Sequence, residues 1–189
     1  MAEALNPTTE RANIRFLYAD MLTIGLAFAM EWYYLQVYAI HLGATALQLG
    51  VLNSGRALLL VVGSALSNRW QRQYVNAIRA LRVPSLAYKI LLYLAIAFVP
   101  LLPDHQVDAL VALVVISAIP TGIAQGVFLG MMPFAVNKEN LARIVSQRGV
   151  LMNATVLACV FLLGQFLERL PRPANYQAGF VLAFLVSFC

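Results

Sequence analysis

The sequence predicts an all-helical membrane protein, a polytopic bundle of six transmembrane helices. Of its 189 residues 61% are hydrophobic and only 11% are charged, and the mean hydropathy is +0.77. Soluble domains carry about 25% charged residues, so this chain has too few to cover a soluble surface of its size. The basic residues lie in short clusters between apolar runs, which is typical of a membrane protein. This distribution argues for a lipid bilayer, and against nucleic acid, as the partner of a chain with a net charge of +5.

Six apolar runs approach the length of about 20 residues that a helix needs to cross a bilayer. We expect spans over 16–40, 47–66, 84–102, 109–133, 149–167 and 176–189. The last run holds about 14 residues, which is too short to cross. We therefore expect the chain to end inside an element of a longer protein.

The basic residues are distributed unevenly between the links that join these spans. Ten of the thirteen Lys and Arg residues fall on the side of the N-terminus and of the second and fourth links. Two fall on the other side, and Arg56 lies within a span. Because positively charged links stay in the cytoplasm as a rule, we expect a multi-pass protein of the cell membrane, plasma or inner, with a cytoplasmic N-terminus.

The stretch RWQRQYVNAIRALRV between the second and third spans is amphipathic. Its four arginines recur at intervals of three, seven and three residues, which places them on one face of a single helix. They are Arg69, Arg72, Arg79 and Arg82. Such a helix either lies along the inner membrane surface or forms the start of the third span with a bend at Pro84. The second arrangement is the favoured prediction.

Glu31 lies within the apolar first span, in GLAFAMEWYYLQVYAI. An isolated carboxylate in hydrocarbon costs about 3 kcal/mol or more. Arg56 lies near the middle of the second span, which runs the opposite way. Because opposite charges that meet neutralise each other, a Glu31–Arg56 ion pair is the simplest way to offset this cost. Asp20 shares the helical face of Glu31 near the membrane edge, where we expect a solvated or interfacial role.

The sequence leaves the role of the predicted pair open. The pair is either a structural clasp between two helices or part of a substrate or proton path. A third possibility is that one of the two charges reaches the interface or meets an absent partner. Tyr34 lies near the same polar stripe of the first span, where packing or an interfacial position competes with substrate contact.

Small and polar residues mark the fourth and fifth spans. Gly122, Gly126 and Gly130 recur every four residues, a spacing that allows close approach of another helix. We expect them to serve packing rather than ligand contact. Gln125 is a candidate to face a cavity, and Asn153 in the fifth span is a candidate for hydrogen bonds between helices.

The sequence contains no motif of soluble enzyme chemistry, such as a Walker loop, HExxH, CxxC or GxSxG. We therefore expect no enzyme activity, no catalytic residue, no cofactor and no metal site. His41 and His105 lie at predicted outer links, and Cys159 and Cys189 lie in apolar runs as packing residues.

The six-span layout resembles the N-terminal half of a major facilitator superfamily transporter. That family carries a signature of the form G-x-L-a-D-R-x-G-R-R in the link after the second span. The corresponding stretch here is SALSNRWQRQ, in which Leu66, Arg69 and Arg72 match, whereas Asn68 replaces the aspartate. The stretch MPFAVNKENLARIVSQRGVLMN, residues 132–153, resembles the inner link after the fourth span.

The resemblance implies two three-helix inverted repeats that form one half of a twelve-helix carrier, with the C-terminal six-helix half missing from residues 1–189. It implies a substrate site near the midplane, lined by the first and fourth spans. Glu31, Tyr34 and Gln125 are then the best cavity candidates, with Arg56 as the partner of Glu31. Asn68 lacks the charge that latches the inner side in the family, so that Arg69 and Arg72 are left to contact the inner helix ends.

These features predict secondary active transport of a small solute by alternating access. If Glu31 changes its protonation or its partner during the cycle, the transport is proton-coupled. The alternative is a membrane protein that keeps this fold without transporting, such as a sensor or an assembly subunit.

Overall fold

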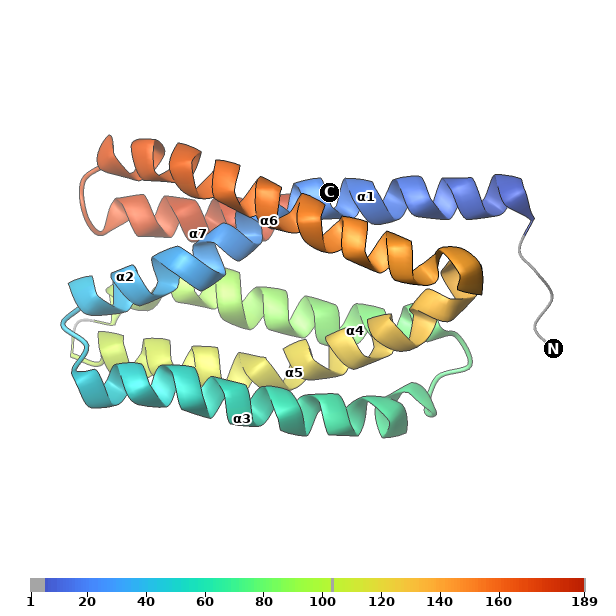
Figure 1. Ribbon diagram of the computed structural model, residues 1–189. Coiled ribbons are helices and arrows are strands. Elements are labelled where there is room, and N and C mark those ends of the chain that lie inside the picture. The colour runs from blue at the N-terminus through green and yellow to red at the C-terminus, as the bar shows by residue number, and fades with distance from the viewer. Residues whose placement is uncertain (1–5, 103, 189) are drawn as a thin grey trace.

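The computed structural model describes residues 6–102 and 104–188, which form a bundle of helices (Figure 1). Helices make up 87% of the structure, and the described residues contain no strand. The elements are α1 (Pro7–Ala29), η1 (Met30–Tyr34), α2 (Leu35–His41), α3 (Ala46–Gln71), α4 (Ala77–Lys89), η2 (Ile90–Ala95), η3 (Val99–Leu101), α5 (Gln106–Ala135), α6 (Lys138–Glu168) and α7 (Ala174–Val186). The predicted all-α class is confirmed. The expectation for Cys189 lies outside the described residues.

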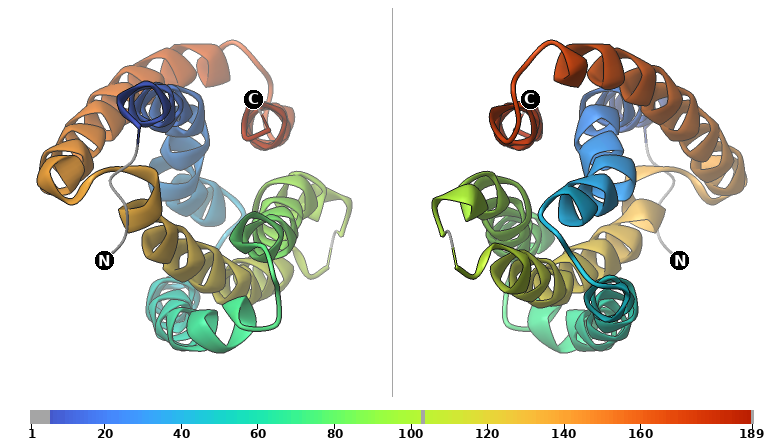
Figure 2. Two further views of the ribbon diagram at one scale, coloured as in Figure 1. Left: turned by 90° about the vertical axis from the view of Figure 1, so that its right-hand side faces the viewer. Right: turned by 90° about the vertical axis from the view of Figure 1, so that its left-hand side faces the viewer.

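Successive helical segments run in opposite directions along the bundle (Figure 1). The start of α1 and the links at 72–76 and 136–137 lie at one end, which we call the N-terminal end, and the links at 42–45 and 169–173 lie at the opposite end. Along the helix axes, α6 and α7 lie on one side and α3 and α5 on the other (Figure 2). The chain from α1 to α2 crosses the space between them, and α1 packs on α6 while α3 packs on α5.

Among the residues that the structure describes, three helices are long and apolar enough to cross a membrane. They are α3, α5 and α6, with 26, 30 and 31 residues, and they cover the second, fourth and fifth predicted spans. The first and third predicted spans are also helical, but each is divided into shorter elements, and α7 has only 13 residues. The structure thus contains three candidate membrane-spanning helices where the sequence predicts six, and these three indicate association with a membrane.

The first and third predicted spans are each interrupted by a π-helical turn. In the first, η1 separates α1 from α2, and in the third, η2 follows α4 directly. A π-helical turn bonds each residue to one further along the chain than an α-helix does, so it shifts the angular order of the side chains. Such turns occur often at functional sites.

The α3–α5 interface depends on glycines that let two backbones approach closely. A Cβ added at Gly122 would overlap the carbonyl oxygen of Leu60, and one added at Gly63 would overlap that of Ile119. At Gly126 the nearest atoms belong to the Ser67 side chain. The predicted packing role is therefore confirmed for Gly122 and Gly126, whereas Gly130 is exposed and meets only the end of the Gln71 side chain.

The packed apolar core lies towards the opposite end of the bundle. Tyr38 of α2 is 1% exposed and stacks on Tyr176 of α7, with ring centroids 4.9 Å apart. Phe180 is fully buried, and its ring centroid lies 5.8 Å from that of Tyr38. Leu92 and Leu110 from the other side of the bundle belong to the same cluster. This end is closed by contact between α2, α7, η2 and α5.

The four arginines of the basic stretch do not share one helical face, so that prediction is wrong. Helix α3 ends at Gln71, the chain reverses over 72–76, and α4 begins at Ala77. The Asn76 side chain accepts the backbone N–H of Ile78 at 2.8 Å and caps α4. As the favoured arrangement predicts for the second half of the stretch, α4 continues through Pro84 into η2 of the third predicted span. The bend expected at Pro84 stays a prediction.

We expect Gly122→Ala to destabilise the protein by about 1–3 kcal/mol, because the added methyl group meets the α3 backbone. The matched control is Gly149→Ala, since no atom lies within 4 Å of a Cβ built there. That variant should be neutral or more stable by about 0.4–1 kcal/mol. The free energy of unfolding in detergent micelles measures both. Equal effects of the two substitutions would contradict the close approach of α3 and α5.

Candidate functional site

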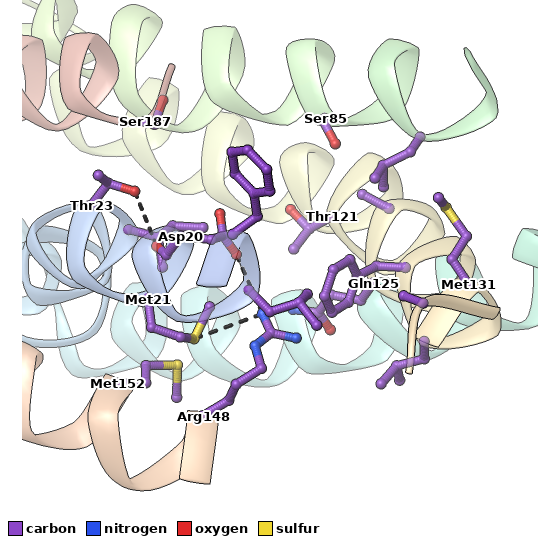
Figure 3. Close-up of a pocket in the computed structure, with 18 of the residues that line it drawn as sticks. Asp20, Met21, Thr23, Ser85, Thr121, Gln125, Met131, Arg148, Met152 and Ser187 are labelled. Carbon is purple, nitrogen blue, oxygen red and sulfur yellow. Dashed lines mark hydrogen bonds and ion pairs between the residues drawn. The ribbon is translucent and has the colours of Figure 1, made fainter. Parts of the chain in front are cut away.

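A cavity of about 1180 Å³ occupies the part of the bundle between its N-terminal end and Glu31. Its walls come from α1, α4, α5 and α6, with the end of α3 and the residues after α7 completing them. Figure 3 shows polar side chains on several of these helices, with Asp20 and Arg148 facing each other and Thr121 and Gln125 on α5. The bundle is therefore open towards the end that carries most of the basic residues and closed at the other.

The deep limit of the cavity is a buried charge cluster around Glu31. The Glu31 carboxylate forms an ion pair with Arg56 of α3, which confirms the predicted pairing. It also accepts a hydrogen bond of 2.8 Å from the hydroxyl of Tyr93. Glu31 is 4% exposed, and Tyr93 is 1% exposed. Glu31 belongs to η1 and Tyr93 to η2, so the two π-helical turns meet at this carboxylate.

A second ion pair lies in the cavity wall, closer to the N-terminal end, and joins α1 to α6. One Nη of Arg148 lies 3.3 Å from a carboxylate oxygen of Asp20. The Asp20 side chain is 48% exposed, whereas that of Arg148 is 10% exposed. The expectation of a solvated position for Asp20 agrees with its exposure.

The Arg148 guanidinium has few strong partners for a buried group. Besides Asp20, it approaches the sulfur atoms of Met132 at 3.5 Å and Met21 at 3.8 Å. It also lies 4.7 Å from the ring centroid of Phe128. Its Nε is buried without a hydrogen-bond partner among the described residues. Because thioethers are weak acceptors, the hydrogen-bonding capacity of this guanidinium is only partly used.

Lys89 is the second cation that lines the cavity. Its ammonium donates to the backbone carbonyl of Ser187, and it lies 4.6 Å from the ring centroid of Phe188. Within the described part of the chain, no carboxylate lies within ion-pair distance of Lys89.

The candidate residues predicted from the sequence lie at different places in the structure. Glu31 and Gln125 both line the large cavity. Tyr34 does not, because its hydroxyl donates to the carbonyl of Val160 at 2.6 Å and its ring lines a smaller cavity of about 480 Å³ at the opposite end. Asn153 is exposed and lines neither cavity. The predicted inner-gate residues Asn68, Arg69 and Arg72 are exposed at the end of α3.

Sequence reasoning missed Tyr93, Lys89 and Arg148 as site residues. Tyr93 looked like an ordinary aromatic residue of an apolar span, and Lys89 and Arg148 lie where basic residues normally reach the interface. The number of charged residues within or next to the predicted spans could have indicated Lys89 and Arg148, because each charge inside a bilayer needs a partner. Among the described residues, no group of three His, Cys, Asp or Glu side chains could hold a metal ion.

A hydrogen-bonded cluster joins α1 to the start of α6 at the N-terminal end. The Glu10 carboxylate accepts bonds from the Asn137 backbone N–H at 3.0 Å, the Asn137 amide at 2.7 Å and the Asn140 amide at 3.0 Å. Asn13 donates to the carbonyl of Ala135 at 3.0 Å. The bonds from Asn140 and Asn137 hold the pKa of Glu10 below its ordinary value of 4.5. This carboxylate therefore fixes one wall of the cavity entrance.

Comparison with protein-family models, with curated proteins and with solved structures gives no match for this chain.

Removing one partner of the deep ion pair should be strongly destabilising. We expect Arg56→Gln to lower the free energy of unfolding by about 3–5 kcal/mol, because Glu31 would remain buried without its counter-charge. The double variant Glu31→Gln with Arg56→Gln should recover most of this loss. Arg72→Gln, at an exposed position, is the control for charge alone. Chemical unfolding in micelles gives the values, and equal stability of the Arg56 and Arg72 variants would disprove the pairing.

The Glu10 cluster predicts a loss of stability in acid. The pKa of Glu10 is lower in the folded protein than its unfolded value of 4.5. The ionised carboxylate therefore contributes its full stabilisation above pH 4.5, and this contribution is lost as the pH falls through the pKa of the folded state. Glu10→Gln should therefore unfold at a lower temperature than the unmodified protein at pH 7, and the difference should shrink below pH 4.5.

Thermal unfolding from pH 7 to pH 3 tests this, with Glu139→Gln, a neighbouring exposed carboxylate, as the control. A gap between Glu10→Gln and the unmodified protein that stays constant with pH would contradict the role of the carboxylate.

Proposed function

We propose that this protein is a membrane transporter that moves a small solute by alternating access. One observation carries the proposal: a large cavity with charged walls runs from one end of an apolar helical bundle to a buried ion pair, and the other end holds the packed aromatic core beside a smaller cavity of about 480 Å³. A site reached from one side and closed from the other is what alternating access requires of each end state. The arrangement therefore resembles one state of a carrier with its cavity open at the N-terminal end.

We further propose that the five longer helical segments cross the membrane, that α7, with 13 residues, belongs to a sixth crossing, and that together they form the N-terminal half of a carrier of the major facilitator type. The alternation of the links between the two ends supports this topology, as does the degraded signature at the end of α3. In this proposal the N-terminal end faces the cytoplasm of a plasma or inner membrane. The exposed Arg69 and Arg72 would then contact a second six-helix half.

Glu31 is the residue we propose for proton coupling. It is the buried acid at the deep end of the cavity, and its two partners come from different helices. A carboxylate whose charge is balanced by one arginine can gain a proton if that arginine moves to another partner, which links protonation to helix movement.

The test is uptake by the natural full-length protein in proteoliposomes under an imposed pH gradient, with labelled anionic, neutral and cationic solutes. We expect gradient-dependent uptake in the unmodified protein. The double variant Glu31→Gln with Arg56→Gln, which keeps the deep site neutral, should retain exchange of solute but lose its dependence on the gradient. Unchanged pH dependence would refute the role of Glu31. Absence of flux for every solute class would instead favour the alternative, a sensor or an assembly subunit.

A further inference from the structure

The charges at the cavity leave a net positive charge once Arg56, the partner of Glu31, is counted. Four charged side chains lie in its wall: Asp20, Glu31, Lys89 and Arg148. Glu31 is neutralised by Arg56, which is not part of the lining. One half-exposed carboxylate, Asp20, is left facing two cations. A ligand with one negative charge would therefore balance the cavity, whereas a cationic ligand would increase its imbalance.

Arg148 has unused donors in a position suited to an anion. Its guanidinium offers five N–H groups, but it has one carboxylate contact at 3.3 Å and two thioether contacts. The residue is only 8% exposed, so it is held in a low-dielectric wall where a charge-assisted hydrogen bond is strong. Figure 3 shows the guanidinium directed between α1 and α5, into the space that these helices line.

The rest of the wall is mainly apolar and rich in aromatic rings, with uncharged polar side chains between them. Six aromatic side chains line the cavity: Phe16, Phe28, Tyr88, Phe128, Phe134 and Phe188. Met21 and Met152 add polarisable and adaptable surface next to Arg148. The aromatic part of the wall favours a flat apolar group.

We infer that the cavity binds an amphiphilic organic anion, an aromatic carboxylate in its simplest form. Arg148 binds the carboxylate with Lys89 as the second cation, and the ring lies against the aromatic wall. Asp20 competes with the ligand for Arg148, since it contacts the same guanidinium and is exposed enough to leave it for water. This inference rests on the proposed function, for which it names the substrate class.

The test is equilibrium binding to the natural full-length protein in lipid nanodiscs, measured by titration calorimetry with three probes that share one ring system. The probes are 2-naphthoate, 2-naphthamide and 2-naphthylmethylammonium, and nanodiscs without protein correct for partition into lipid. We expect saturable binding of the carboxylate, with the amide and the ammonium at least about tenfold weaker, since a charge-assisted bond contributes about that factor. Equal or tighter binding of the ammonium would overturn the inference.

Variants separate a ligand-binding role from a structural one. Arg148→Gln should weaken 2-naphthoate binding about tenfold or more, and Arg143→Gln, an exposed arginine on the same helix, should not change it. Asp20→Asn should tighten binding several-fold, because it removes the competitor. A purely structural Asp20–Arg148 pair predicts weaker binding in Asp20→Asn as well. That result would refute the proposal, and it can be obtained even if Arg148→Gln fails to fold.

Equilibrium binding can be measured without any transport, so the anion site and the transport function can be refuted independently. Saturable 2-naphthoate binding without uptake of any solute would refute transport but keep this site. Uptake confined to cationic solutes would refute the anion site but keep transport.

Discussion

The structure depends most on the neutralisation of Glu31. A carboxylate that is 4% exposed in an apolar bundle must have its charge balanced and its oxygen atoms hydrogen-bonded, and Arg56 and Tyr93 meet these two requirements. Because the three residues come from three helical segments, the charge fixes how the first, second and third segments sit together at mid-length. This cluster also divides the bundle. The packed aromatic core around Tyr38 lies on one side of it, and the cavity lies on the other.

Much of the fold and the central ion pair could be predicted from sequence because they follow from hydropathy and charge balance. Within the described residues, every predicted span is mostly helical, and the Glu31–Arg56 pair follows from two opposite charges at similar depth. The reversal at 72–76 was missed because that link contains neither Gly nor Pro, so the basic stretch reads as one continuous helix. The Asp20–Arg148 pair joins residues 128 positions apart, and nothing local in the sequence marks the two as neighbours.

The π-helical turns explain why one periodicity argument held and another did not. Asp20 and Glu31 were placed on one helical face at 100° per residue, and both do line the large cavity. Only the last residues of that interval enter the π-helical turn, so the angle between the two changes little. Tyr34 lies at the end of η1, after the wider turn has altered the rotation, and it contacts α6 near the opposite end instead. A regular α-helical period does not extend across such a turn.

The two ion pairs differ in depth, and depth determines how easily each can exchange its partner. Separating Arg56 from Glu31 would leave a carboxylate that is 4% exposed without a counter-charge, so any separation must be accompanied by protonation or by a new partner. Asp20 is 48% exposed, and water can solvate it as soon as it leaves Arg148. Arg148 itself stays buried, so it needs another anion in place of Asp20. In the transport cycle that we propose, the deep pair would link helix movement to proton uptake, and the shallow pair would link opening of the wall to an incoming anion. The two pairs along one cavity would then supply the two couplings that a proton-driven carrier of anions needs.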